Sequence, residues 1–366
     1  MEIIHANKET MTAKERVRRT FAFEKTDRVT IGYEANGAIH NALCHALGVP
    51  TNDWEALMRT LGVDYRSIGA RYTGPKLFDD IDGRNVDPLD GFVMKWIEHS
   101  TGGYWDFCDF PLADAEDEAF ETYKMPNPDD FDYDGALASA KRYNNEFGLY
   151  IGHAGMADVI NSNGRLMGME DTLCHLITEN EAALDFMQRR AKWQLGMFER
   201  LLAKCGEHLD FVWLGEDLGT QHSPMISLDL YRKVLKPLHK GFVDAAAAYN
   251  LPVLVHTCGS SSWVYEDFIG MGVRGVDTLQ PEAANMSPEY LVKQFGGRLN
   301  FRGAISTTGD LAYGTPQDVD TVCRETLEIM MPTHGYHFAP THMIQDNSPV
   351  ENVVAMYNAV QKYGFY

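Results

Sequence analysis

The chain has 366 residues, a length that one barrel of alternating strands and helices can use in full. Hydrophobic residues make up 45% of it, but no apolar run reaches the roughly 18 residues of a membrane span, which excludes an integral membrane protein. The 52 acidic residues outnumber the 32 basic ones, and the net charge of −20 argues against nucleic acid or an anionic membrane surface as partner.

The start of the chain, "MEIIHANKET", has neither a basic segment followed by an apolar one nor an arginine-rich transit pattern. The six cysteines are scattered without the spacing of a disulfide framework. We therefore expect a cytoplasmic protein with reduced thiols. Nothing in the sequence indicates an oligomeric state.

Eight short apolar runs, each bounded by glycine, proline or polar residues, follow one another along the chain. They are "VTIGYE" (29–34), "DYRSIGAR" (64–71), "GLYIGHAG" (148–155), "FVWLGEDLG" (211–219), "LPVLVHTCG" (251–259), "GVDTLQPE" (275–282), "LNFRGAIS" (299–306) and "GYHFAPTH" (335–342). Helical patterns separate most of them, which is typical of parallel strands with helical crossovers. The sequence therefore predicts an α/β fold, a (β/α)8 TIM barrel, over residues 1–366 as a single domain.

Helix starts support this alternation. Ser287, Thr315 and Ser348 each precede a proline and a carboxylate, the pattern of a capped helix N-terminus. Thr12 and Glu15 have the spacing of a capping box and predict an N-terminal helical extension.

The segment from about 71 to 145 is too long for a barrel loop, and we interpret it as a small insertion over one end of the barrel. Within it, "GFVMKWIEHSTGGYWDF" (91–107) alternates like an antiparallel hairpin. Five aromatic residues of the insertion are expected to form either a local core or one wall of a substrate pocket: Trp96, Tyr104, Trp105, Phe107 and Phe110.

Soft metal ligands gather where the predicted strands end. His256 and Cys258 lie two residues apart, so both point to the same side of a strand. Imidazole and thiolate together suit zinc. His342 ends the last strand and is a third candidate ligand, while Glu216, which with Asp217 ends "FVWLGEDLG", is either a fourth ligand or a catalytic acid.

Other residues at the strand ends are candidates for handling substrate, since catalytic groups of barrels collect there. His153 is a candidate proton donor. Tyr33, Glu34 and Gln280 are candidate substrate-binding residues. Arg302 and Asp277 are expected to be buried ion-pair partners.

Three segments, 11–29, 256–319 and 335–360, resemble the uroporphyrinogen decarboxylase superfamily, and more closely its branch of zinc-dependent, corrinoid-linked methyltransferases, which includes methylcobamide:coenzyme M methyltransferases and O-demethylase methyltransferases. The resemblance extends over nearly the whole chain and is weakest between about 71 and 145. It implies a (β/α)8 barrel, in agreement with the strand count. Decarboxylation is not expected, because no arginine lies between Arg28 and Arg59, where the decarboxylases hold their substrate carboxylates.

In the methyltransferase branch, an H-x-C motif and a cysteine near the end of the last strand bind zinc. His256 and Cys258 match the motif, but His342 stands where the family has cysteine. One thiolate and two imidazoles leave zinc with a charge of about +1, whereas two thiolates neutralise it. Such a site is the stronger Lewis acid and favours an oxygen or nitrogen leaving group over an attacking thiol.

The resulting hypothesis is methyl transfer from a small donor to the Co(I) corrinoid (cobalamin) of a partner protein, as in O-demethylation. The donor is methoxylated, by preference aromatic, or otherwise methylated; methylamines, betaines and methanol stay open. The alternatives are methyl transfer from a methylcobamide to a thiol, and a non-catalytic partner of a corrinoid protein.

Overall fold

The computed structural model describes residues 1–99 and 102–366. Eight parallel strands form one sheet in the order β1-β13-β12-β11-β10-β9-β8-β2. They are β1 (Thr30–Ile31), β2 (Tyr65–Ser67), β8 (Gly148–Gly152), β9 (Phe211–Gly215), β10 (Val253–His256), β11 (Gly275–Asp277), β12 (Asn300–Ile305) and β13 (Tyr336–Pro340). Each of the eight predicted strands is confirmed.

The two ends of this sheet meet at Asp64. Its backbone N–H donates to the carbonyl of Ile31 at 3.0 Å, and its carboxylate accepts the N–H of Ile31 at 2.7 Å. The sheet therefore curves into a nearly closed (β/α)8 barrel, as predicted. Strands β9, β12 and β13 are buried along their whole length, and β9 is accordingly apolar throughout, whereas β12 and β13 carry the buried polar residues Asn300, Arg302 and His337.

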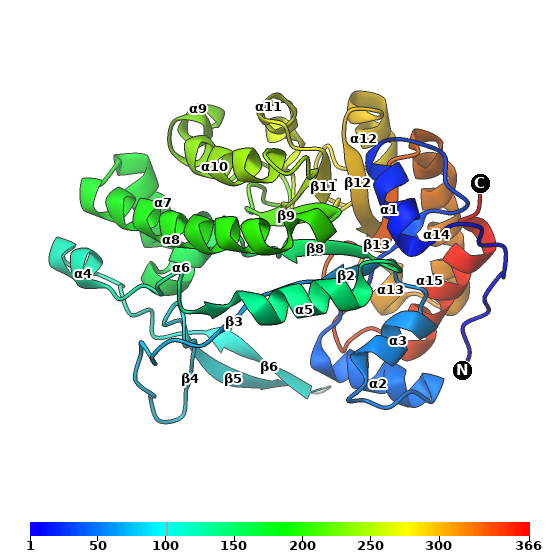
Figure 1. Ribbon diagram of the computed structural model, residues 1–366, viewed down its shortest axis with the longest axis horizontal. Helices are drawn as coiled ribbons and strands as arrows, with labels where there is room; N and C mark the ends of the chain where they lie inside the picture. The colour runs from blue at the N-terminus through cyan, green and yellow to red at the C-terminus, as the bar shows by residue number, and fades with distance from the viewer. Residues whose placement is uncertain (100–101) are drawn as a thin grey trace.

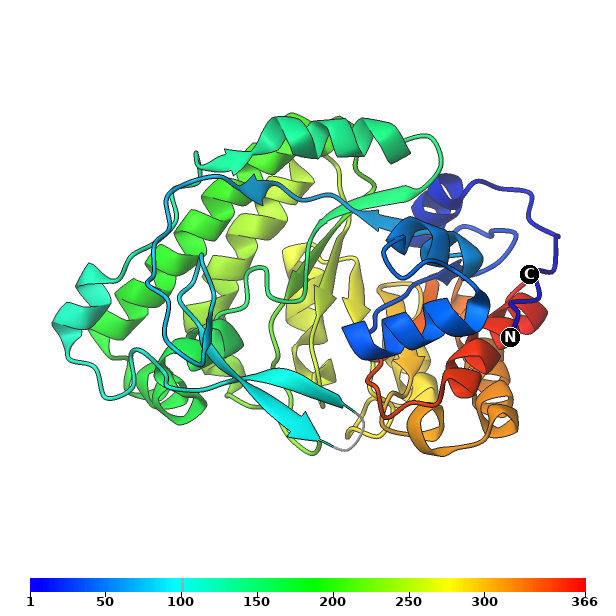
Figure 2. The same cartoon turned by 90° about the horizontal axis from the view of Figure 1, so that it is seen from below.

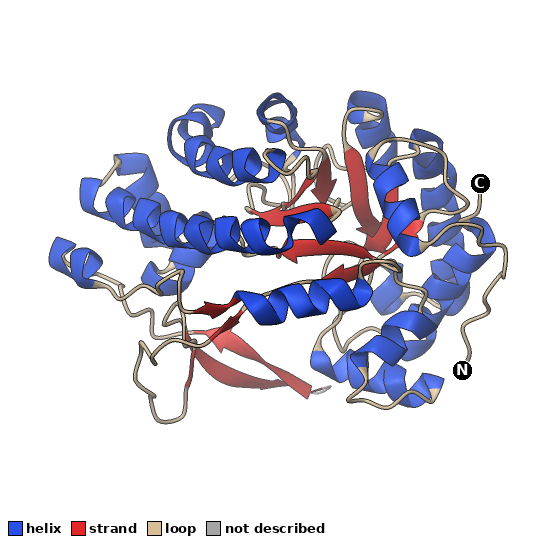
Figure 3. Cartoon of the chain, in the orientation of Figure 1, coloured by secondary structure: helices blue, strands red, loops and turns tan. Residues whose placement is uncertain are grey.

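Helices surround the strands (Figures 1 and 3). They are α1 (Ala13–Phe21), α2 (Gly37–Leu47), α3 (Trp54–Thr60), α5 (Tyr133–Tyr143), α6 (Ile160–Met167), α7 (Met169–Thr178), α8 (Glu181–Cys205), α9 (Leu228–Leu230), α10 (Lys236–Ala247), α11 (Tyr265–Met271), α12 (Pro288–Phe295), α13 (Asp310–Tyr313), α14 (Pro316–Met330) and α15 (Val350–Tyr363). In the described part of the chain, no helix has the length and apolarity needed to cross a membrane.

The predicted helix starts are mostly confirmed. Ser287 and Thr315 cap α12 and α14, and Thr315 forms a full capping box with Asp318. The Thr12 hydroxyl caps α1 by accepting the N–H of Glu15. The prediction for Ser348 is wrong, because the N-cap position of α15 is occupied by Pro349, which offers no side-chain oxygen.

Helix α1 lies across the N-terminal ends of the strands. The guanidinium of Arg16 contacts Asp64 at 2.6 Å, just before β2, and Arg18 contacts Asp210 at 2.5 Å, just before β9. This predicted extension therefore covers the end of the barrel away from the C-terminal ends of the strands. Both chain termini lie on one side of the molecule (Figure 2).

The insertion consists of β3 (Arg71–Tyr72), β4 (Asn85–Val86), β5 (Val93–His99), β6 (Gly102–Phe107), α4 (Asp117–Thr122) and β7 (Phe131–Asp132). Strands β5 and β6 form the predicted antiparallel hairpin with Trp96 opposite Trp105, while Ser100 and Thr101 lie outside the described residues. The predicted boundary at 145 is too late, because α5 is the crossover helix that leads into β8. Figure 1 shows the hairpin beside the barrel, below α6 and α8.

Candidate metal centre

His256 and Cys258 follow each other at the C-terminal end of β10. His256 is the last residue of the strand and is buried, and Cys258 is half-buried in the loop that follows. The Sγ atom of Cys258 lies 3.4 Å from Nε2 of His256. Burial raises the pKa of the Cys258 thiol, while its contact with His256 acts in the opposite direction. The two predicted ligands therefore converge.

His342 reaches the same point from the loop after β13. Its ring meets that of His256 edge to face with 5.8 Å between centroids, and the ligand atoms of His256, Cys258 and His342 all lie within 4.8 Å of one another. Zinc bonds of about 2.0–2.3 Å in a tetrahedron separate ligand atoms by roughly 3.5 Å, so the three donors fit a zinc ion after small adjustments. Three protein ligands leave a fourth position for substrate.

Asp277 fixes the orientation of His256. Its Oδ2 lies 2.9 Å from Nδ1 of His256, and the hydroxyl of Thr278 lies 2.8 Å from the same nitrogen. Burial alone would raise the pKa of Asp277, but the charge of Arg302, whose Nη1 donates to Oδ1 at 2.7 Å, lowers that pKa to about 2. The ionised carboxylate holds the proton of His256 on Nδ1 and leaves Nε2 free for a metal.

Asp277→Asn is therefore expected to weaken zinc binding by about 10–100-fold while the fold is kept, because an amide cannot hold His256 as strongly. Competition with a chromophoric chelator measures the dissociation constant. An unchanged constant would show that Thr278 alone orients the ring.

Arg302 and Asp277 are the buried ion-pair partners that the sequence predicts. The second nitrogen of Arg302, Nη2, contacts the carboxylate of Glu34. Arg302 also lies over the ring of Trp213, 4.9 Å from its centroid. The result is a buried chain from Glu34 through Arg302 and Asp277 to His256.

Glu216, predicted as either a fourth ligand or a catalytic acid, lies outside the group of three converging ligand atoms. Its two carboxylate oxygens accept the backbone N–H groups of Val159 at 2.8 Å and Ile160 at 3.0 Å, and it lies 3.1 Å from His239 Nε2. Burial raises the pKa of Glu216 to about 8. The side chain thus satisfies the N-terminus of α6, and it is not among the residues that line the cavity beside the metal group.

Glu216→Ala is expected to lower the free energy of unfolding by about 1–3 kcal/mol, because the N–H groups of Val159 and Ile160 lose their acceptor, while zinc content is unchanged. Denaturant titration and metal analysis on one preparation test both parts. Loss of zinc from a folded variant would restore Glu216 as a ligand.

The neighbouring acid, Asp217, faces the metal group instead. One carboxylate oxygen accepts the backbone N–H of Cys258 at 2.7 Å and lies 3.9 Å from Nε2 of His256, and the other accepts from Asn161 at 2.8 Å. The sequence indicates two acids at this strand end but not which of them turns inward, since the strand ends at Gly215 and alternation ceases there.

A cavity of about 570 Å³ opens beside the metal group. His256, His342 and Asp217 line it from the barrel, and His153, whose Nδ1 accepts the N–H of Gly155 at 3.0 Å, lines it from the end of β8. The insertion supplies another wall, including Phe92 and Phe107. His153 therefore lies where a proton donor is predicted, and its role stays a prediction.

Of the five aromatic residues predicted to form a local core or a pocket wall, Phe107 alone lines the cavity. The side chains of four of them are exposed, with 38–52% of their surface accessible, so they form neither a core nor a cavity wall: Trp96, Tyr104, Trp105 and Phe110. The walls come instead from Phe92 and from apolar residues of β5 and the preceding loop, Met94 and Leu89.

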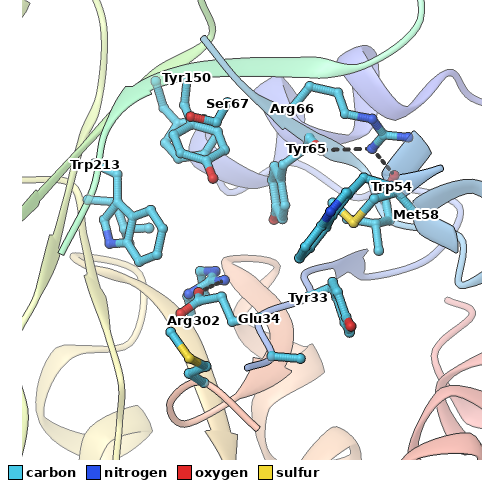
Figure 4. A pocket seen from close by; sticks show the side chains of 15 residues that line it. Tyr33, Glu34, Trp54, Met58, Tyr65, Arg66, Ser67, Tyr150, Trp213 and Arg302 are labelled. Carbon is cyan, nitrogen blue, oxygen red and sulfur yellow. Dashed lines mark hydrogen bonds and ion pairs between the residues drawn. The ribbon is translucent and has the colours of Figure 1, made fainter. Parts of the chain in front are cut away.

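Tyr33 and Glu34 line a second cavity of about 320 Å³, shown in Figure 4. Aromatic rings surround it, and the ion pair of Glu34 and Arg302 lies on one side of it. Ser67, at the end of β2, lines both cavities, which therefore adjoin. Gln280 lies half-buried in the loop after β11 and lines neither cavity, and its role in substrate binding stays a prediction.

Comparisons with known proteins agree with this architecture. The family model described as uroporphyrinogen decarboxylase matches residues 157–363. A solved structure described as a methyltransferase from Methanosarcina mazei has a TM-score of 0.67 and 15% identity, and the match covers 97% of this chain and 99% of that one.

A second solved structure, xylanase 10B from Thermotoga maritima, is similar at a TM-score of 0.38 and 12% identity over 67% of this chain and 85% of that one. No curated protein matches the sequence. The family match covers more than half of the chain, from the loop after β8 to the end of α15, and includes all three candidate ligands. On this evidence, the chain belongs to the uroporphyrinogen decarboxylase family.

Proposed function

We propose that this protein is a zinc-dependent methyltransferase that moves a methyl group from a small methoxylated or methylated donor, by preference a methoxylated aromatic, to the Co(I) corrinoid of a partner protein. The observation that carries the proposal is the group of His256, Cys258 and His342 at the mouth of the barrel, beside a cavity of about 570 Å³. Similarity to a structure described as a methyltransferase supports it.

Zinc, when bound by these three residues, supplies a Lewis acid of charge about +1. In the proposed transfer, Co(I) provides the electron pair for the new Co–C bond, the C–O bond of the donor breaks, and the oxygen leaves with that bond's electrons. A phenolate, whose conjugate acid has a pKa of about 10, is a poor leaving group without such help.

In this proposal, His153 assists the leaving group by donating a hydrogen bond to the departing oxygen. Because Nδ1 accepts the N–H of Gly155, the proton of the neutral ring is on Nε2. Burial lowers the pKa of His153, so the neutral ring acts through the hydrogen bond that its Nε2–H donates, and the departing oxygen takes up its proton from solvent. The apolar wall from the insertion limits the access of water to the donor.

The test uses zinc-loaded protein, photochemically or chemically reduced cob(I)alamin as acceptor, and a panel of methoxybenzoates, methylamines, betaine and methanol. Formation of methylcobalamin, followed by its absorbance, is expected with a methoxylated aromatic and is expected to disappear in His342→Ala. Exposed His222 provides the matched control, His222→Ala.

Two outcomes would replace the proposal. Release of cob(I)alamin from methylcobalamin only when a thiol is added would favour methyl transfer to a thiol. No transfer with any donor or thiol, together with stable binding of a corrinoid protein, would favour a non-catalytic partner.

A further inference from the structure

One cation lines the cavity beside the metal group and has no hydrogen-bond or ion-pair partner among the described residues. Arg165 lies in the last turn of α6 and lines the cavity together with His153, His256 and His342. Among the residues that the structure describes, Arg165 makes no hydrogen bond and no ion pair. A guanidinium has five N–H donors, and those of half-buried Arg165 are open to a ligand that enters the cavity.

The insertion holds this guanidinium in place. Its Cζ atom lies 4.7 Å from the ring centroid of Phe107 and 5.6 Å from that of Phe92, and these two rings meet at 90°. Cation–π contacts position a charge without using its hydrogen bonds. Arg165 is therefore preorganised, and its N–H groups stay available to a ligand.

The acids that share this cavity are already engaged. Asp90 pairs with Arg190 at 2.6 Å, and the carboxylate of Asp87 accepts the N–H groups of Leu89 and Asp90. Burial raises the pKa of Asp158 well above its usual range, which favours its uncharged form. The fourth acid of the cavity, Asp217, accepts from Cys258 and Asn161, and none of the four forms an ion pair with Arg165.

We infer that Arg165 binds the acid group of the methyl donor, and that the donor is a small aromatic carboxylate with its methyl-bearing atom at the metal group. Phe92, Phe107 and Leu89 supply apolar surface for the ring. A planar carboxylate matches the fork of a guanidinium with two parallel hydrogen bonds. This inference rests on the proposed function for the identity of the ligand as methyl donor, but its test measures binding alone.

Calorimetric titration of the zinc-loaded protein with para-methoxybenzoate and with its neutral analogue para-methoxybenzamide tests the inference. The parent is expected to bind the carboxylate about tenfold or more tightly than the amide, which is the usual gain from charge-assisted hydrogen bonds. Arg165→Met, which keeps the apolar stem between the two rings, is expected to bind both equally, and Arg165→Lys to keep part of the preference.

The control is Arg298→Met, because Arg298 is paired with exposed Glu266 at 2.7 Å on the outside of the barrel. It should leave the preference unchanged. Zinc content and the thermal unfolding midpoint of each variant show whether Arg165 only fixes the insertion to α6.

The inference is overturned if the parent does not prefer the carboxylate, or if a folded, zinc-loaded Arg165→Met keeps that preference. It is also overturned if mercaptopropionate, an acid that carries a thiol, shows Arg165-dependent binding and para-methoxybenzoate does not. Arg165-dependent binding of para-methoxybenzoate without methyl transfer would leave this inference intact and refute the proposed function.

Discussion

Alanine in place of His256, Cys258 or His342 is expected to reduce zinc from about one ion per chain to nearly none and to abolish methyl transfer. Each residue provides one of the three converging ligand atoms, while the carboxylates of Glu216 and Asp217 are engaged by backbone N–H groups and are not expected to replace a lost ligand. Mass spectrometry of the acid-digested protein gives the metal content, and circular dichroism confirms the fold.

Exposed Cys174 on α7 provides the control, because Cys174→Ala removes a thiol that lies outside the metal group and does not line the cavity, and the variant should keep the zinc. His342 is the most informative of the three ligands, since it is exposed and comes from a different strand end. Full zinc occupancy in His342→Ala would remove it from the ligand set and, with it, the charge argument for an oxygen leaving group.

His342→Cys separates binding from chemistry. A second thiolate binds zinc at least as well but neutralises its charge, so zinc content should stay near one per chain while transfer from an ether donor falls. If transfer from the ether donor is unchanged in this variant, the charge of the metal does not determine the choice of donor.

The barrel could be predicted from the sequence because its signals are local. Glycine, proline or polar residues bound each apolar run, and hydroxyl caps such as Ser287 and Thr315 mark where helices begin. Barrel closure then brings the C-terminal ends of distant strands to one mouth, so that His342 meets His256 although 85 residues separate them in the chain, as the two residue numbers show.

The features that could not be predicted depend on loops, because side chains in a loop do not alternate between two faces as they do in a strand. Beyond Gly215 the backbone leaves the strand, so the sequence could not show that Asp217 turns to the cavity and Glu216 turns to α6. Alternation predicted the hairpin of the insertion but not which of its faces meets the barrel, and Trp96 and Trp105 lie outside. Arg165 gave no signal at all, because a single arginine in a helix usually faces solvent.

Arg302→Met is expected to lower the free energy of unfolding at neutral pH by about 3–5 kcal/mol, because Asp277 and Glu34 lose the cation that they share inside the barrel. Methionine fills much of the same volume, so the loss reflects uncompensated charge more than a cavity. The matched control, Arg298→Met, removes an equally close ion pair at the surface and should cost at most about 1 kcal/mol.

The pH dependence identifies the cause. In the parent, Arg302 holds the pKa of Asp277 at about 2, below the value of about 3.9 in an unfolded chain. The ionised carboxylate therefore stabilises the fold at pH values above about 4. This contribution is lost only as the pH falls from about 4 to about 2. Without Arg302, burial raises the pKa of Asp277 and makes its ionised form destabilising at neutral pH. Protonation relieves that cost, so the difference in stability between parent and variant should narrow as pH is lowered from about 7 to about 5.

Denaturant titrations of both proteins across this range measure the difference, with a chelator present so that metal release contributes to neither curve. A difference that is constant with pH would assign the loss to packing against Trp213, over whose ring Arg302 lies. A narrowing difference would show that Arg302 is retained for its charge. In that case the same guanidinium that stabilises the barrel also keeps Asp277 ionised and thereby holds His256 ready for the metal.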